Sequence, residues 1–156
     1  MALKPDRIET VTDVSFFSSS AIATRGGVVS VTGGGSGVSM DNAAAVVAYA
    51  SAPSGNKPVG VLLNDVVSLD LTRQHINFHK DEVQKGGKVT LLQVGQVTTN
   101  LVSGTIAAGD AAYAGPSGYI TNVLPVSDNT EEYYRVGRFL SKKDTDGYAK
   151  VAVSIA

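Results

Sequence analysis

The clearest alternation of apolar and polar residues lies at the C-terminal end of the chain. Every second residue from 149 to 155 is apolar, namely Ala149, Val151, Val153 and Ile155. A period of two is typical of a half-buried β-strand, because successive side chains point to opposite faces of the sheet. The pair Asp146-Gly147, just before this run, is a common tight-turn sequence. The pattern therefore predicts a hairpin whose second strand belongs to a sheet.

Short β-type segments also recur through the middle of the chain. Between residues 59 and 101 the sequence predicts a meander, in which Ile76 and Phe78 alternate with polar neighbours and Gly86-Gly87 forms a turn. We expect Gly95 to end the strand that begins at residue 88. Short strands at regular spacing are typical of a β-barrel or β-sandwich.

Two further segments have a less regular pattern. Residues 28–31 predict a short strand, whereas residues 43–50 suit either a helix capped by Asp41 or Asn42 or a strand. Val46, Val47 and Tyr49 favour the strand. Residues 127–132 predict one helical turn, because Ser127 or Asp128 could cap it. No amphipathic helix of ten or more residues is expected.

The N-terminal region, residues 1–24, leaves two alternatives open. Residues 8–12 alternate without a strongly apolar face, and Phe16-Phe17 precedes three serines. The region is either an edge strand and loop packed on the domain, or an arm that lies on a neighbouring subunit. In the second case each fully buried phenylalanine would contribute roughly 1.5–3 kcal/mol. Residues 25–156 are expected to form a single β domain.

Composition narrows the class of protein. A chain of 156 residues and 16.1 kDa can bury its own core, and with 0 Cys it has no disulfide framework. Its net charge of −1, without a basic stripe, argues against direct nucleic-acid binding. The apolar run at 43–50 is far below the ~20 residues of a membrane span. Asp6 and Glu9 stand where a signal peptide would be apolar.

Candidate catalytic and metal sites find little support in the sequence. On a strand, His75 and His79 would lie about 13 Å apart, which is too far to share an ion. The fragment Asp144-Thr145-Asp146-Gly147 lacks the other ligands of a calcium loop and suits a hairpin turn better. Residues 33–37 match no phosphate-binding loop. We therefore expect no catalytic residue, metal or cofactor, and a protein that is not an enzyme.

Charged residues of both signs concentrate between residues 70 and 88. They include Arg73, His75 and Lys80 in a chain of which only 17% is charged. The segment is either a solvated hairpin and loop or a contact surface on which charge pairs set the register with a partner.

The last third of the chain carries a resemblance to a known family. The residues concerned are Ile106, Gly109, Asp110 and Tyr113, then Gly118, Ile120 and Thr121, then Val136, Gly137, Phe139 and Leu140, then Asp146, Gly147, Tyr148, Lys150, Val151 and Val153. This series resembles the head decoration, or capsid cement, proteins of tailed bacteriophages. Residues 25–29 resemble the same family more loosely.

The resemblance implies an all-β fold, a small β-barrel or sandwich (β-tulip-like) with an extended N-terminal arm and little helix. It also implies a homo-oligomer, with a trimer expected first and a dimer second, that binds the major capsid protein on the outside of the virion after assembly in the bacterial cytoplasm. It would stabilise the expanded head without contacting nucleic acid or membrane. Position and chemistry give the candidate contact residues Leu3, Ile8, Phe16, Phe17, Arg25, Arg73, His75 and Lys80. Turns and bulges are assigned to Gly109, Asp110, Gly118, Gly137, Asp146 and Gly147.

Two other functions remain open. A carbohydrate- or host-surface-binding module would need aromatic side chains on one face, and five tyrosines lie close together in the sequence: Tyr113, Tyr119, Tyr133, Tyr134 and Tyr148. The other alternative is a different β-rich phage subunit, such as a tail tube or fibre protein.

Overall fold

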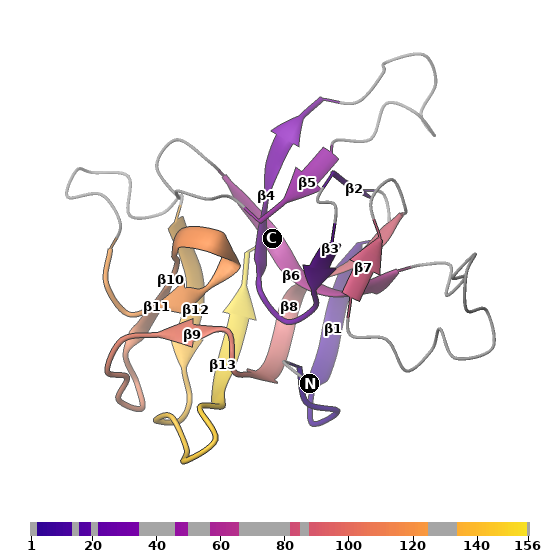
Figure 1. The fold of residues 1–156 in the computed structure, drawn as a ribbon. Coiled ribbons are helices and arrows are strands. Elements are labelled where there is room, and N and C mark those ends of the chain that lie inside the picture. The colour runs from indigo at the N-terminus through magenta and orange to yellow at the C-terminus, as the bar shows by residue number, and fades with distance from the viewer. Residues whose placement is uncertain are drawn as a thin grey trace.

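The computed structural model describes residues 3–13, 16–19, 22–34, 46–49, 57–65, 82–84, 88–124 and 134–155, and these are nearly all in strands, turns and short connections (Figure 1). The strands are β1 (Ile8–Asp13), β2 (Phe17–Ser18), β3 (Ile22–Thr24), β4 (Val28–Gly33), β5 (Val46–Ala48), β6 (Pro58–Asp65), β7 (Glu82–Gln84), β8 (Val89–Thr99), β9 (Val102–Ser103), β10 (Ala111–Ala114), β11 (Ile120–Thr121), β12 (Arg135–Phe139) and β13 (Ala149–Ser154). A short 3-10 turn, η2 (Pro116–Gly118), lies between β10 and β11. The all-β prediction is confirmed.

Most of these strands belong to one large open sheet. Its order is β2-β5-β4-β6-β8-β13-β12-β10-β11-β9, and β1 pairs with β8 beside this path. The strands β3 and β7 form a separate antiparallel pair. Among the described strands the path does not close into a barrel. None of the described helical segments is long and apolar enough to cross a membrane.

The long strand β8 connects two parts of the sheet. Leu92 pairs with Thr12 of β1 and with Val61 of β6, whereas Gly95 pairs with β1 and with β13. Because a strand has only two edges, β1 must run along one edge of β8 while β6 and β13 share the other, one after the other. The halves β2-β5-β4-β6 and β13-β12-β10-β11-β9 therefore meet at β8.

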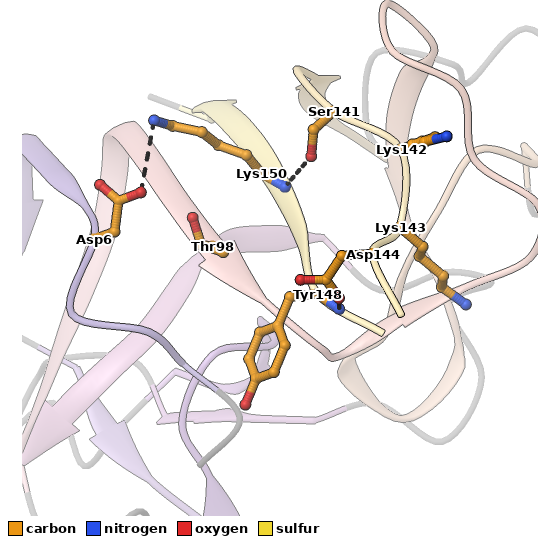
Figure 2. A pocket seen from close by; sticks show the side chains of 8 residues that line it. All are labelled: Asp6, Thr98, Ser141, Lys142, Lys143, Asp144, Tyr148 and Lys150. Carbon is orange, nitrogen blue, oxygen red and sulfur yellow. Dashed lines mark hydrogen bonds and ion pairs between the residues drawn. The ribbon is translucent and has the colours of Figure 1, made fainter. Parts of the chain in front are cut away.

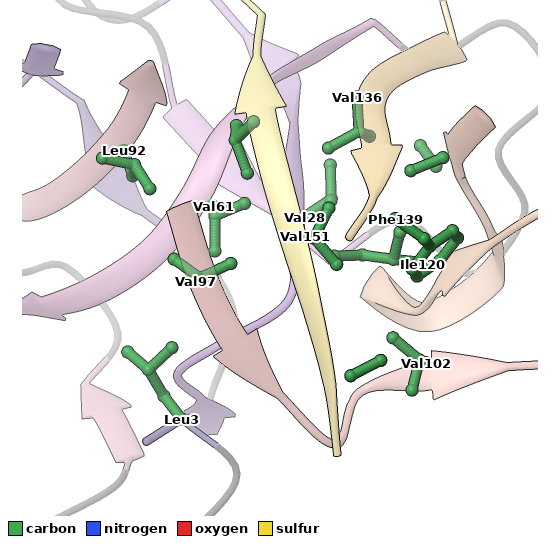
Figure 3. Close-up of a cluster of buried hydrophobic side chains, with 14 of the residues drawn as sticks. Leu3, Val28, Val61, Leu92, Val97, Val102, Ile120, Val136, Phe139 and Val151 are labelled. Carbon is green, nitrogen blue, oxygen red and sulfur yellow. The ribbon is translucent and has the colours of Figure 1, made fainter. Parts of the chain in front are cut away.

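The core consists of two clusters on opposite faces of this arrangement. The larger cluster includes Leu92, Val97, Phe139 and Val151, with side chains from both halves of the sheet (Figure 3). The smaller cluster is made by Val29, Val47, Leu62, Val89 and Leu91. Neighbours along β4, β6 and β8 thus alternate between the two clusters, as the period of a strand requires. This part of the sheet is buried on both faces.

Several sequence predictions can be compared directly with these strands. In β13, Ala149, Val151 and Val153 are buried and alternate with more exposed residues, which confirms the predicted pattern. The strand predicted at 28–31 is confirmed, and the start of the predicted meander lies in β6. Within residues 43–50, for which a helix or a strand was open, residues 46–48 form the strand β5. The prediction that Gly95 ends a strand is wrong, because pairing on both edges carries β8 through this residue to Thr99.

Other predictions fall outside the described residues. They are the strand with Ile76 and Phe78, the histidine pair, the turn at Gly86-Gly87 and the helical turn at 127–132.

Candidate interaction surface

The strand β1 lies on the domain but keeps its side chains on the surface. Residues 8–12 are all exposed, and Asp13 is half-buried. Ile8 and Val11 are 54% and 41% exposed, which is unusual for apolar residues in a paired strand. The nearby ion pair between Arg7 Nε and Glu9 Oε1, at 2.6 Å, is itself partly exposed and contributes little to stability. The strand therefore shares its backbone with β8 and offers its side chains to solvent.

The chain on either side of β1 is anchored to β8 and the core. Leu3 is 1% exposed in the larger cluster, and Lys4 N donates a hydrogen bond to Thr98 O at 2.9 Å. At the other end, Val89 N donates to Phe16 O at 3.0 Å, and the half-buried Phe16 packs on the smaller cluster. These contacts attach the chain to β8 both before and after β1, and they make Leu3 part of the core.

The other candidate contact residues have different surroundings. Phe17, in β2, is half-buried, and Lys88 Nζ lies 5.6 Å from the centre of its ring. Arg25 is half-buried in the turn between β3 and β4. Arg73, His75 and Lys80 lie outside the described residues. Of the eight candidates, the structure brings Leu3, Ile8 and Phe16 to the same edge of β8, and Phe17 forms a bridge with Lys88 just before that strand.

A lysine-rich hollow of about 370 Å³ lies beside the anchored N-terminal segment (Figure 2). It is bounded by that segment, by β8 and by the hairpin between β12 and β13, through Asp6, Thr98, Ser141, Lys142, Lys143, Asp144, Tyr148 and Lys150. Lys150 Nζ is 4.0 Å from Asp6 Oδ2, and Lys4 Nζ lies 4.4 Å from the centre of the Tyr148 ring. No local pattern in the sequence indicates this hollow, because its three walls come from distant segments that meet only through strand pairing.

The hairpin that forms one wall of the hollow is organised by Asp144. Its Oδ1 accepts hydrogen bonds from Asp146 N at 2.9 Å and from Tyr148 N at 2.8 Å. Gly147 has φ +87°, a conformation that glycine adopts without strain. The calcium-like fragment is therefore a hairpin turn whose carboxylate binds the backbone, as the sequence favoured. The contribution of Asp144 itself was not predicted.

A second turn involves the pair Gly109-Asp110. Asp110 Oδ2 accepts hydrogen bonds from Ala107 N and from Asn122 Nδ2, each at 3.0 Å. These two bonds, that from Ala107 first, hold the pKa of Asp110 below its ordinary value. Gly109 N also donates to Phe139 O at 2.8 Å, so this turn is attached to β12. Gly137 lies in β12 opposite Ala112, next to a register shift between β10 and β12.

Tyr49 joins the two segments that carry the family resemblance. Its hydroxyl accepts a hydrogen bond from Gly27 N at 3.1 Å and donates one to the Thr24 carbonyl. A Cβ on Gly118, which has φ +81°, would lie 2.5 Å from the Tyr49 ring, so the ring requires glycine there. Burial raises the pKa of the Tyr49 hydroxyl. The sequence around Tyr49 indicated only a strand, because no residue near it in the chain shows that its ring packs against Gly27 and Gly118.

The tyrosines of the carbohydrate-binding alternative do not share one exposed surface. Tyr113 and Tyr134 are buried, whereas Tyr119 is 39% exposed and Tyr148 lies under Lys4. Tyr133 lies outside the described residues. The described tyrosines therefore do not form the aromatic platform that this alternative needs.

The described residues contain no group of three or more His, Cys, Asp and Glu side chains that could hold a metal ion. The candidate surface consists of the exposed strand β1, its two anchors and the adjoining hollow.

When the chain is compared with known proteins, no family model matches it, and no curated protein matches it significantly.

Proposed function

We propose that this chain is a structural, non-enzymatic virion protein that binds the outer surface of a phage capsid and stabilises the expanded head. The proposal rests on the sequence resemblance to capsid decoration proteins and on one structural observation. That observation is β1, a strand anchored at both ends and paired along its length that still exposes Ile8 and Val11. Anchoring reduces the entropy that binding would cost, and exposed apolar side chains supply surface that a partner can bury.

In the proposed mechanism each copy bridges neighbouring subunits of the major capsid protein. A protein that binds the expanded shell but not the unexpanded one stabilises the expanded state in proportion to the difference in affinity. Genome pressure would then have to break the contacts of the bound copies before it separated the subunits. A homotrimer is the first expectation for the assembled form, and a dimer is the second.

The test is co-sedimentation of the purified protein with expanded capsids that lack it and, in parallel, with unexpanded procapsids. We expect saturable binding to expanded capsids alone, with a copy number that fixes the symmetry site. The double variant Ile8→Asp/Val11→Asp should bind at least about tenfold more weakly. Burial of two half-exposed apolar side chains can contribute about 1.4 kcal/mol or more to the binding free energy, and 1.4 kcal/mol corresponds to about a tenfold change in affinity.

The matched control is Val123→Asp, at an apolar residue that is 65% exposed and lies outside β1. This variant should bind like the unchanged protein. Equal loss of binding in both variants would point to a general effect of added charge, and no binding to either shell would reject the proposal. Size-exclusion chromatography coupled to light scattering measures the oligomeric state of the free protein. It distinguishes trimers and dimers from the rings or polymers expected of a tail-tube subunit.

A further inference from the structure

The lysine-rich hollow contains polar groups that the fold does not satisfy. Thr98 Oγ1 is buried without a hydrogen-bond partner, although a buried hydroxyl is normally paired. Lys150 Nζ reaches its nearest carboxylate, that of Asp6, only at 4.0 Å, while the Asp6 side chain is 76% exposed. Figure 2 shows Thr98 beneath the Lys150 side chain, between Asp6 and Tyr148. Lys150 is therefore available to a ligand that enters the hollow, whereas Thr98 Oγ1, which has almost no access to solvent, becomes available only when the Lys150 side chain above it moves toward that ligand.

The hollow offers more hydrogen-bond donors than acceptors. Ser141 Oγ accepts a bond from Lys150 N at 2.9 Å, which leaves its own hydrogen free to donate. One oxygen of the Asp144 carboxylate is already used by Asp146 N and Tyr148 N. The other Asp144 oxygen and the Asp6 carboxylate remain as acceptors. They are outnumbered by the hydrogens of the three lysine ammonium groups and of the Ser141 and Thr98 hydroxyls, and this excess of donors suits an anionic oxygen acceptor.

The charge pattern favours a carboxylate over a polyanion. Three lysines line the hollow together with Asp6 and Asp144, so negative charge is interspersed with positive charge. A nucleic acid or an anionic membrane surface needs a continuous basic face, which this mixture does not supply. A single glutamate or aspartate side chain needs only one or two cations, and the Tyr148 ring beside Lys4 provides an apolar wall for its methylene groups.

We propose that this hollow binds carboxylate side chains from an acidic peptide segment of the partner protein. This inference rests on the proposed function, because it identifies that partner with the capsid subunit that contacts β1. The segment that carries Lys4 and Asp6 continues directly into β1, so one partner can cover both surfaces. Charge pairs at the hollow would then set the register of the apolar contact on β1.

The experiment titrates the isotope-labelled protein with a tetraglutamate peptide and, separately, with inorganic phosphate, while backbone amide shifts are followed by NMR. We expect saturable shifts at Thr98, Tyr148 and Lys150 with the peptide, and weaker effects with phosphate at equal ionic strength. Lys150→Gln and Thr98→Val should each weaken peptide binding at least fivefold. The control Lys57→Gln, at an exposed lysine that does not line the hollow, should leave it unchanged. Saturation by phosphate but not by the peptide, or no saturation by either, overturns the proposal.

Capsid binding by the same variants separates this inference from the proposed function. If the unchanged protein and Lys150→Gln bind expanded capsids equally, the hollow is not part of the contact and the inference fails while the proposed function stands. If the unchanged protein binds the peptide but no capsid, the proposed function fails and the hollow remains a carboxylate site for a different partner. A thermal melt of each variant confirms that it is folded before binding is compared.

Discussion

The strands β1 and β13 are similar in backbone and opposite in burial. Both contain six residues, and both pair antiparallel with β8 across Val94, Gly95 and Gln96, from its two edges. In β13, Ala149, Val151 and Val153 are at most 2% exposed, whereas residues 8–12 of β1 are all exposed. Hydrogen-bonded pairing alone therefore does not tell which strand stabilises this domain and which is available to a partner.

The difference has a simple physical basis. A fully buried valine contributes roughly 1.5–3 kcal/mol, and β13 supplies two to the larger core cluster. By contrast, β1 contributes mainly backbone hydrogen bonds, each of about 0.5–1.5 kcal/mol net. It also pairs with β8 alone among the described strands, while β13 lies between β8 and β12. We therefore expect β13 to be part of the stable core and β1 to be the more easily detached of the two.

The strongest test places the same charge in both strands. In β13, Val151→Asp would bury an unpaired carboxylate and should destabilise the protein by more than about 4 kcal/mol, enough to unfold many domains. In β1, Val11→Asp should change the free energy of unfolding by less than about 0.5 kcal/mol, because the side chain is 41% exposed and a carboxylate there can reach solvent. Urea unfolding followed by circular dichroism measures both values.

The two variants serve as controls for each other, since the substitution and the strand length are the same. A similar loss of stability in both would show that β1 contributes to the core in solution. The comparison between the two strands would then be wrong, and β1 could not be regarded as a surface reserved for a partner.

A smaller effect is expected from Gly95→Ala, which acts on the pairing of β1 with β8. A Cβ at this position would collide with the carbonyl oxygen of Ile8. Overpacking of this kind typically costs about 1–3 kcal/mol. Amide hydrogen exchange should become faster in residues 8–13, while residues 149–154 keep their protection. Faster exchange in β13 to the same degree would show that the two strands separate from β8 together.

The sequence predicted the strands whose pattern is local, and it failed where pairing with distant strands decides the structure. The alternation of β13 predicts both its strand and its buried face, because its apolar face points into one core cluster. In β8, by comparison, Gly95 wrongly predicts the end of a strand, since nothing near it in the sequence reveals that two other strands pair across it. The anchoring of Leu3 in the core was not foreseen either, because it depends on Thr99, which lies far away in the sequence.

The candidate surface was harder to predict from the sequence than the fold. The exposure of Ile8 fits the weak apolar pattern of residues 8–12, which is compatible with an edge strand, one of the two alternatives for this region. The hollow could not have been predicted, because Asp6, Thr98 and Lys150 come from three distant segments that meet through strand register. Local patterns thus predicted single strands and turns, while sites built from several strands required the tertiary structure.

The smallest expected effect concerns Asp110, on the side of the molecule to which β13 belongs. Hydrogen bonds from Ala107 N and Asn122 hold the pKa of this carboxyl below its ordinary value of 3.8. A depressed pKa means that the ionised form stabilises the folded state, so the contribution is complete above the ordinary value and is lost as pH falls through the folded value. At pH 7 the melting temperature of Asp110→Asn should be slightly below that of the unchanged protein.

This gap should narrow as the pH is lowered below about 4, because the unchanged protein then loses the same contribution by protonation. The control is the same substitution at an exposed aspartate in the hairpin before β13, Asp146→Asn, measured over the same pH range. The measurement is the melting curve of each of the three proteins between about pH 2.5 and about pH 7. These limits lie below and above the pKa range of aspartate side chains. A gap that persists unchanged at the acid end would mean that the substituted asparagine fails to hold the turn for steric reasons. The carboxylate charge would then have no part in stabilising the half of the sheet that contains β13.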